Sequence, residues 1–556
     1  MQFADINADR PTRAGLSAEY AELFALMDAG NTPDAMRRWE AMRRETDTWF
    51  SLTHLHFSQD TASAQYKAER EYADQMGPVV TEFETNMKRR LLAADHGQSS
   101  APAPPHLQAL WRLDISTFDP AIAADLEAES GLESRYTQLL ASAKIPFDGR
   151  EFNLAGLQPF LQNLNRPTRH RAAVATWTFF QSHGEELDSL YDQLVKLRTK
   201  IARVLGDDVF TPLGYRRMRR VDYGPAEVET YRAEVLTHVT PLVSRLMERR
   251  KRENNLDELY AWDEPVIDPA GNPTPAGDRQ FLTGAAQGMF EQINPHLADL
   301  YRQMLGGGFM DLDNRPAKAG GGFCTSFPKF GMPFIFANFN GTHHDIDVFT
   351  HEMGHAFQNY QSRNQPILDF FWPTMDAAEI HSMSLEFLAY PQISSLMGDN
   401  AERYRRMHLQ AALEFLPYGV CVDHFQHEIY NHPELTPQER NQTWRRLESL
   451  YMPWRKWGDL QYPASGARWQ AQQHIYRSPF YYIDYTLAQC AALQFWRLSR
   501  LDYPSAVGRY VGLCEQGGAA PFTTLLASAG LNSPFEPGSL AGVVREAAEY
   551  LQIGTP

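Results

Sequence analysis

Apolar side chains recur at the spacing of an α-helix along most of the chain, and this periodicity constrains the fold more than any other feature. Met36, Trp39 and Met42 share one predicted helical face, and arginines occupy the other faces. Residues 172–205 and 227–254 continue the pattern with few helix-breaking residues. Such stripes pack against one another in a helical core. The sequence therefore predicts a mainly α protein.

Proline and turn residues mark where the predicted helices stop. Pro102, Pro104 and Pro105 predict a loop inside the first helical region, because proline lacks the N–H donor that a helix needs. The segment DPAGNPTPAG at residues 268–277 predicts a second loop.

One part of the chain has the pattern of β-strands. Short aromatic runs at residues 323–326 and 333–339 are separated by Pro328 and Gly331, which predicts a hairpin. Two interpretations stay open. The hairpin is a small core sheet, or one of its strands is a free edge that pairs with an extended peptide.

Composition and charge exclude several classes of protein. Hydrophobic residues at 43% and charged residues at 22% are typical of a globular chain. The net charge of −16 disfavours nucleic acid and anionic membranes as partners. No stretch approaches the roughly 20 apolar residues of a membrane helix, and the first residues lack the apolar core of a secretory signal. Four scattered cysteines form no C-x-x-C pair, so we expect a reducing cytoplasm.

The motif H-E-x-x-H at residues 351–355 indicates a metal site on a helix. Thr342 and Asp345 favour a helix start just before it. His351 and His355 are four positions apart, so both imidazoles reach one ion from the same helical face. Glu352 lies beside them and is placed to hold a water molecule rather than the metal.

A catalytic zinc ion usually has three protein ligands, so the two histidines require a third. Glu379 supplies it from a second predicted helix, residues 376–390, which follows antiparallel to the first. Asp376 and Glu386 lie on nearly the same face and offer carboxylates to the free N–H of a zinc-bound histidine. The ligand types favour one Zn²⁺ ion, and cobalt or manganese fits the same donors.

A rival metal cluster lies at His424, His427 and Glu428 in the segment DHFQHEIY. Its spacing places the carboxylate poorly for a shared ion, so we expect an ordinary helix there.

Several motifs together resemble the thimet oligopeptidase and oligoendopeptidase F family of zinc metallopeptidases, and most closely its Pz-peptidase-like branch. They cover most of the chain beyond residue 200, whereas the first 200 residues resemble the family only in helical character. The motifs are GYRRMRRVDYG at 214–224, AGGGFCTSF at 319–327, HEMGHAFQ at 351–358, DAAEIHSMSLE at 376–386 and PFYYIDYTLAQ at 479–489.

The resemblance implies roles for named residues. His351, His355 and Glu379 would bind zinc, and Glu352 would act as the base. It also implies a two-lobed helical fold with a deep substrate channel and a small β-sheet beside the zinc helix. We expect an N-terminal helical lobe at residues 1–200 that covers the channel and a catalytic lobe at residues 201–556. Such a channel admits short unfolded peptides and excludes folded proteins.

The resemblance also suggests transition-state donors near residue 480. We choose His474, Tyr482 and Tyr485, because the two tyrosines share a helical face while Tyr481 is expected to point elsewhere. The thimet branch has a more glycine-rich segment here, and many relatives carry a further histidine in place of Gln358.

The predicted function is zinc-dependent hydrolysis of internal bonds in short peptides. One alternative is a helical zinc carboxypeptidase, which trims the C-terminus of a peptide. Another is a non-catalytic peptide-binding protein with a structural metal. Structural zinc sites usually have four protein ligands, whereas the predicted set of three leaves a coordination position open. The sequence makes no prediction of oligomeric state.

Overall fold

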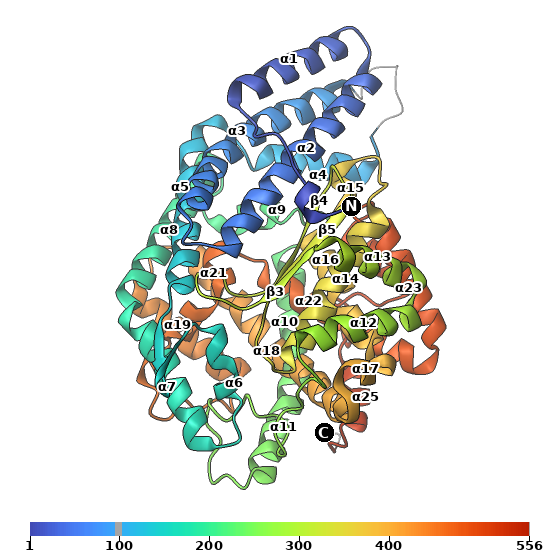
Figure 1. Cartoon of the computed structure of the whole chain (residues 1–556). Coiled ribbons are helices and arrows are strands. Elements are labelled where there is room, and N and C mark those ends of the chain that lie inside the picture. The colour runs from blue at the N-terminus through green and yellow to red at the C-terminus, as the bar shows by residue number, and fades with distance from the viewer. Residues whose placement is uncertain (95–102, 555–556) are drawn as a thin grey trace.

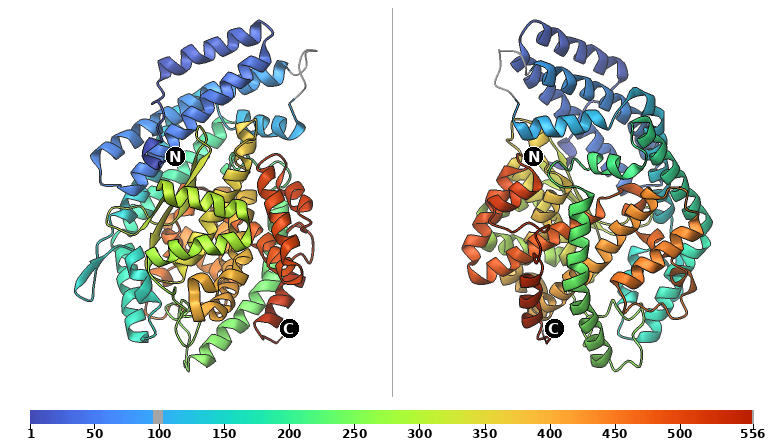
Figure 2. Two further views of the ribbon diagram at one scale, coloured as in Figure 1. Left: turned by 45° about the vertical axis from the view of Figure 1, so that its right-hand side comes forward. Right: turned by 180° about the vertical axis from the view of Figure 1, so that it is seen from behind.

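Helices make up nearly all of the regular structure, as the sequence predicts (Figure 1). The computed structural model describes residues 1–94 and 103–554. Figure 2 shows the first helices stacked at one end of the molecule, with the end of the described chain at the other. Within the described residues, no helix has both the length and the apolar character needed to cross a bilayer.

The N-terminal helices pack around their own apolar cluster. Trp39 is fully buried in it, and Met36 and Met42 pack against it, which confirms the predicted stripe. Of the predicted proline loop, Pro102 lies outside the described residues. Pro105 is the first residue of a helix, a position where the missing N–H costs no hydrogen bond. The cluster is formed by α1 Arg13–Asp28, α2 Thr32–Gln59, α3 Ala64–Ala94 and α4 Pro105–Ser116, whereas the next helix, α5 Ala123–Ala141, packs against the main core.

The middle of the chain is helical with two irregularities. The predicted helix at 172–205 is two helices that meet at His183. The predicted helix at 227–254 runs nearly unbroken but widens into a π turn at Val235–Val239, just before Pro241 withholds a backbone donor. The helices are α6 Gln158–Leu161, α7 Arg166–Ser182, α8 Gly184–Val204, α9 Phe210–Arg217, α10 Pro225–Glu234, α11 Thr240–Glu253, α12 Arg279–Ile293 and α13 Pro295–Gly307.

A three-stranded sheet contains the predicted hairpin. Strands β4 Phe323–Phe327 and β5 Met332–Phe339 pair antiparallel, from Phe323 with Phe336 to Phe327 with Met332. Strand β3 Met310–Asp313 pairs parallel to β5, so the order is β3-β5-β4 and β4 is an edge strand. The sequence did not predict β3. A separate short hairpin joins β1 Ile145–Phe147 and β2 Arg150–Phe152.

The helix that carries H-E-x-x-H starts differently from the prediction. Thr342 does not cap it, because its hydroxyl donates to Asn340 Oδ1 at 2.7 Å. Asp345 accepts hydrogen bonds from the backbone N–H groups of Asn340 and Gly341 at 2.9 and 2.8 Å, so the loop before the helix folds onto this carboxylate.

The C-terminal half supplies the remaining helices. They are α14 His344–Ser362, α15 Leu368–Phe371, α16 Met375–Leu388, α17 Ser394–Met397, α18 Ala401–Asn431, α19 Pro437–Tyr451, α20 Gln461–Ala464, α21 Gln473–Arg477, α22 Tyr482–Leu501, α23 Tyr503–Gln516, α24 Phe522–Ser528 and α25 Ala541–Tyr550.

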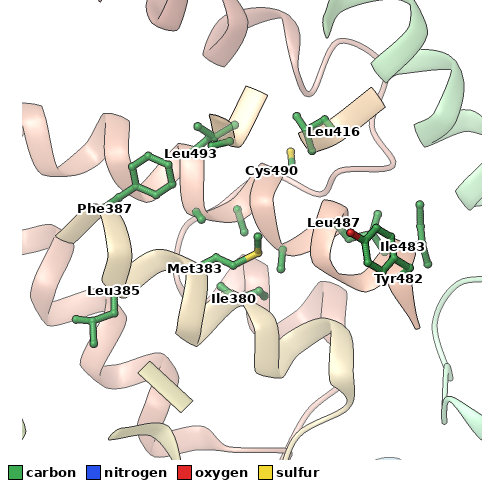
Figure 3. Close-up of a cluster of buried hydrophobic side chains, with 14 of the residues drawn as sticks. Ile380, Met383, Leu385, Phe387, Leu416, Tyr482, Ile483, Leu487, Cys490 and Leu493 are labelled. Atoms are coloured by element: carbon green, nitrogen blue, oxygen red, sulfur yellow. The ribbon is translucent and has the colours of Figure 1, made fainter. Parts of the chain in front are cut away.

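Helix α16 is the centre of the core. It packs against both α14 and α22, and α22 also packs against α18. Figure 3 shows the apolar side chains at this junction. Ile380 and Met383 of α16 meet Leu487 and Cys490 of α22 there. The main apolar cluster contains residues from before and after position 200, so the lobe boundary at 200 stays a prediction.

Candidate metal centre and active site

Three metal-binding side chains converge where α14 packs against α16. His351 and His355 lie one turn apart, with ring centroids separated by 5.0 Å. Glu379 Oε2 lies 3.2 Å from His351 Nε2 and 3.3 Å from His355 Nε2. One ligand atom from each residue lies within 4.8 Å of the others. In the described part of the chain, no other group of His, Cys, Asp and Glu converges in this way.

Gly354 lets the two helices approach this closely. A Cβ atom at this position would lie 2.6 Å from the backbone oxygen of His381 and 2.6 Å from Ser382 Cα. Both are backbone atoms of α16, so they cannot rotate away as a side chain would. A larger residue inside the H-E-x-x-H motif would therefore push Glu379 away from the two imidazoles.

A chain of hydrogen bonds orients His351 through Nδ1, the ring nitrogen that faces away from the ligand group. His351 Nδ1 donates to Glu386 Oε1 at 2.7 Å, and His408 Nε2 of α18 donates to Glu386 Oε2 at 2.7 Å. His408 Nδ1 is hydrogen-bonded to the Tyr390 hydroxyl at 2.8 Å. Because His351 Nδ1 carries a proton, the lone pair of Nε2 is free for a metal ion. Of the two carboxylates that the sequence offers for this role, Glu386 takes it.

Glu352 lies in the same cavity but outside the ligand group. Burial raises the pKa of its carboxyl group. Its Oε2 atom is buried and has no hydrogen-bond partner within the described chain. Gly322 leaves room for it, since a Cβ there would lie 3.2 Å from Glu352 Oε1. A buried carboxylate oxygen without a donor is unfavourable alone, and a bound water would satisfy it.

The charges around Glu379 fit a divalent cation. Glu379 and Glu386 are paired with histidines. No Lys or Arg of the described residues lies within 4.0 Å of either carboxylate or of Glu352. Two imidazole nitrogens and one carboxylate oxygen are the protein donors of many catalytic zinc sites. The side chains present therefore fit such an ion.

A cavity of about 260 Å³ opens beside this group. Its walls come from distant parts of the chain. His54 of α2 and Arg70 of α3 face it from the N-terminal helices, and Phe323 and Cys324 of the edge strand β4 line it as well. The cavity thus lies between the N-terminal helices and the metal centre, with a free strand edge alongside.

Two of the predicted transition-state donors line this cavity. His474 Nε2 lies 3.3 Å from the Tyr485 hydroxyl, and Gln472 Nε2 donates to His474 Nδ1 at 2.8 Å. Burial lowers the pKa of His474 to about 4, so the ring is neutral at pH 7 with its proton on Nε2. Tyr481 also lines the cavity, and its hydroxyl donates to Glu379 Oε1.

The expectation that Tyr481 points away from the site is wrong. Tyr481 has helical backbone angles just before α22 and lies four residues before Tyr485, so the two rings share a face with centroids 4.8 Å apart. Tyr482 instead packs against the rings of Phe415 and Tyr418, with centroids 5.7 and 5.8 Å from its own, and belongs to the main apolar cluster. It is 9% exposed and does not line the cavity. The sequence allowed either pairing, because spacings of three and of four both share a helical face, and the side of α22 that faces the cavity decided between them.

The rival cluster on α18 does not converge on one point. His427 Nε2 lies 3.0 Å from the Tyr215 hydroxyl, and His424 Nδ1 lies 3.0 Å from the Tyr451 hydroxyl. Each imidazole is thus hydrogen-bonded to the hydroxyl group of a different tyrosine. This arrangement agrees with the expected ordinary helix.

Two histidines and one glutamate that can bind a metal, with a second glutamate free in the adjoining cavity, define the class of metallopeptidases. Comparisons with known proteins agree. Residues 292–542 match the model of peptidase family M3, and residues 3–118 match the peptidase M3 N-terminal domain. Comparison with curated protein sequences gives no match.

Solved structures similar to the chain extend this result over its whole length. A protein provisionally assigned as oligoendopeptidase F is 43% identical, with 99% of each chain covered and a TM-score of 0.96. PZ peptidase A, solved with an inhibitor, is 40% identical with the same coverage and TM-score. A protein of Bacillus anthracis with the same provisional assignment is 38% identical, covering 99% of this chain and 98% of that chain, with a TM-score of 0.91.

The chain therefore belongs to peptidase family M3. It is a metallopeptidase of the oligoendopeptidase type, and the resemblance seen in the sequence motifs is confirmed.

Proposed function

We propose that the chain is a zinc-dependent oligoendopeptidase that cleaves internal bonds of short unfolded peptides. One observation carries this proposal. His351, His355 and Glu379 converge at one point, and the unpartnered Glu352 carboxylate lies in the adjoining cavity. Three protein ligands leave a coordination position open, as catalysis requires.

Zinc bound to these ligands would supply Lewis acidity, polarising the scissile carbonyl and lowering the pKa of a water to about 7. Glu352 would take the proton of the attacking water and then transfer it to the leaving nitrogen. Glu386 would keep His351 oriented throughout, because it accepts the imidazole proton at 2.7 Å.

Donors on the opposite side of the cavity would stabilise the negative oxygen of the transition state. His474 presents a neutral ring, and Tyr481 and Tyr485 present hydroxyl groups on one face. We propose His474, Tyr481 and Tyr485 for this role and leave Tyr482 to the apolar core. Removing one such donor costs roughly 10²–10³-fold in turnover.

The substrate would bind as an extended strand. The free edge of β4 lies along the cavity and offers main-chain hydrogen bonds to a peptide backbone. The cavity volume of about 260 Å³ suits a few residues at a time rather than a folded domain. We further propose a reducing cytoplasm as the location, since all four cysteines are free.

The test uses an internally quenched peptide library. We expect cleavage by the purified chain, loss of cleavage after chelation, and recovery when zinc is added back. Glu352→Gln should retain zinc and lose about 10²–10⁴-fold in turnover, because an amide cannot accept the proton. Near-normal turnover by Glu352→Gln would contradict the assigned base.

Two alternatives give different results in the same assay. A zinc carboxypeptidase would stop when the peptide C-terminus is an amide, and its products would lack only C-terminal residues. A non-catalytic binding protein would bind peptide without any zinc-dependent cleavage. Internal cleavage of an amidated peptide would exclude both alternatives.

A further inference from the structure

Two arginines line the cavity beside the metal centre, and one of them has no acidic partner. Arg70 of α3 has its Nε 2.9 Å from Asp74 Oδ1, as an ion pair. Arg477, the last residue of α21, donates from Nη1 to Gln473 Oε1 at 3.2 Å. No Asp or Glu of the described residues lies within 4.0 Å of the Arg477 guanidinium.

The carboxylates that share this cavity are engaged elsewhere. Glu133 lines it, but Glu133 Oε1 accepts a hydrogen bond from Arg198 Nη2 at 2.8 Å. Glu352 and Glu379 belong to the metal centre. Among the described residues, Arg477 therefore forms no ion pair of its own and feels only the charge of Glu133, which Arg198 holds, although the guanidinium is half-buried.

Positive charge from both arginines acts on the same part of the cavity. Arg70 Nη1 lies 3.3 Å from His54 Nδ1. Burial, together with the charges of Arg70 and Arg477, lowers the pKa of His54 to about 3. His54 is thus neutral at pH 7 and adds no charge to that of the two guanidinium groups. A carboxylate that entered this region would meet donors suited to bidentate binding.

We propose that Arg477, assisted by Arg70, binds a carboxylate group of the peptide substrate. The enzyme would then select peptides whose carboxylate reaches Arg477 when the scissile bond lies at the metal centre. The inference rests on the proposed peptidase function. The carboxylate has two possible sources, the C-terminus of the peptide or an Asp or Glu side chain, and both share the chemistry that a guanidinium recognises.

The experiment measures kcat and KM for matched quenched peptides with the zinc-loaded enzyme. One pair differs only in a free acid or an amide at the C-terminus. Other pairs replace Glu by Gln at one position at a time on either side of the cleaved bond. We expect the wild type to favour one anionic member by about tenfold or more, mainly through a lower KM. The preferred pair identifies the source of the carboxylate.

Substitutions then assign the preference to Arg477. Arg477→Gln should bring the anionic-to-neutral ratio of kcat/KM to within about twofold of one, and Arg477→Lys should keep part of it. Arg252→Gln, at an exposed arginine of α11, serves as the control and should keep the full ratio.

Three results would overturn the inference. They are a wild type with no charge preference, an Arg477→Gln enzyme that keeps the full preference, and an Arg252→Gln enzyme that loses it equally. The wild-type result does not depend on how any variant folds. Failure of the proposed function looks different, because then no peptide of either charge is cleaved in the presence of zinc.

Discussion

Two clusters of charged side chains balance their charges in different ways. The junction cluster joins the N-terminal helices to α15, which immediately precedes α16. It contains three basic and four acidic side chains, namely Arg43, Lys88, Arg219, Glu40, Glu84, Asp114 and Asp369. The metal-site cluster contains three carboxylates and two imidazoles, namely His351, Glu352, His355, Glu379 and Glu386.

In the junction cluster every carboxylate contacts Arg or Lys. Arg43 Nη1 lies 2.8 Å from Asp369 Oδ2, and Lys88 Nζ lies 2.9 Å from Asp114 Oδ2. In the metal-site cluster no carboxylate pairs with Arg or Lys among the described residues, and Glu379 and Glu386 pair with histidines instead. The carboxylates of the first cluster therefore find their counter-charges within the folded chain, whereas those of the second require a cation from outside.

Loss of a ligand should have the largest effect, because it removes the external cation. We expect Glu379→Gln to reduce bound zinc from one ion per chain to nearly none, and to abolish cleavage with it. Metal analysis after gel filtration measures this. The exposed Glu434→Gln serves as a control and should keep its zinc. A Glu379→Gln protein with a full complement of zinc would show that the ion lies elsewhere.

The same type of substitution in the junction cluster should change stability and leave zinc in place. Asp369→Asn leaves Arg43 and Arg219 without their shared partner, which should cost about 3–5 kcal/mol of unfolding free energy. Urea denaturation monitors the loss. Asp299→Asn breaks the exposed pair with Arg302 and should cost less than about 1 kcal/mol. Equal losses in the two variants would refute the distinction.

A smaller effect, on zinc affinity, is expected from substituting His408, which contacts Glu386 rather than the metal. His408→Gln removes the imidazole that donates to Glu386 Oε2 at 2.7 Å, so Glu386 holds His351 less firmly. Outer partners of this kind typically change metal affinity by about 10–100-fold. Competition with a chromophoric chelator gives the dissociation constant. If zinc binds as tightly as in the wild type, the hydrogen-bond chain has no role in metal binding.

The smallest effect concerns pH and applies to the junction cluster. Burial by itself raises the pKa of Asp369, but Arg43 and Arg219 lower it well below its usual range. Its contribution to stability is thus complete above about pH 4, the ordinary pKa, and declines as the pH falls below that value. The difference in unfolding free energy between wild type and Asp369→Asn should be constant from pH 5 to 8 and shrink toward pH 3. A difference that grew on acidification would contradict this sign.

The sequence predicted the parts of the structure that depend on local spacing. The interval between His351 and His355 gives the metal face, and the aromatic runs around Gly331 give the hairpin. Glu379 was predicted because a second helix follows at once and carries a suitable carboxylate. Each of these inferences uses residues that are close together in the chain.

Features that depend on distant residues were not predicted. His408 reaches Glu386 from α18, and β3 pairs with β5 across a long connection. Asp376 offered a carboxylate of the same type as Glu386, but Tyr223 donates to it at 2.7 Å instead. The choice of Tyr481 over Tyr482 also escaped prediction, because both lie within one turn of Tyr485 and the packing of α22 decides which of them faces the cavity. In these cases tertiary packing, not local pattern, selects the partner.

Anomalous diffraction at the zinc absorption edge, from crystals of the purified chain, would locate the metal relative to its three proposed ligands. We expect one strong peak per chain, about 2.0–2.2 Å from His351 Nε2, His355 Nε2 and a Glu379 oxygen. A peak between His424 and His427, or none after zinc is added, would contradict this expectation.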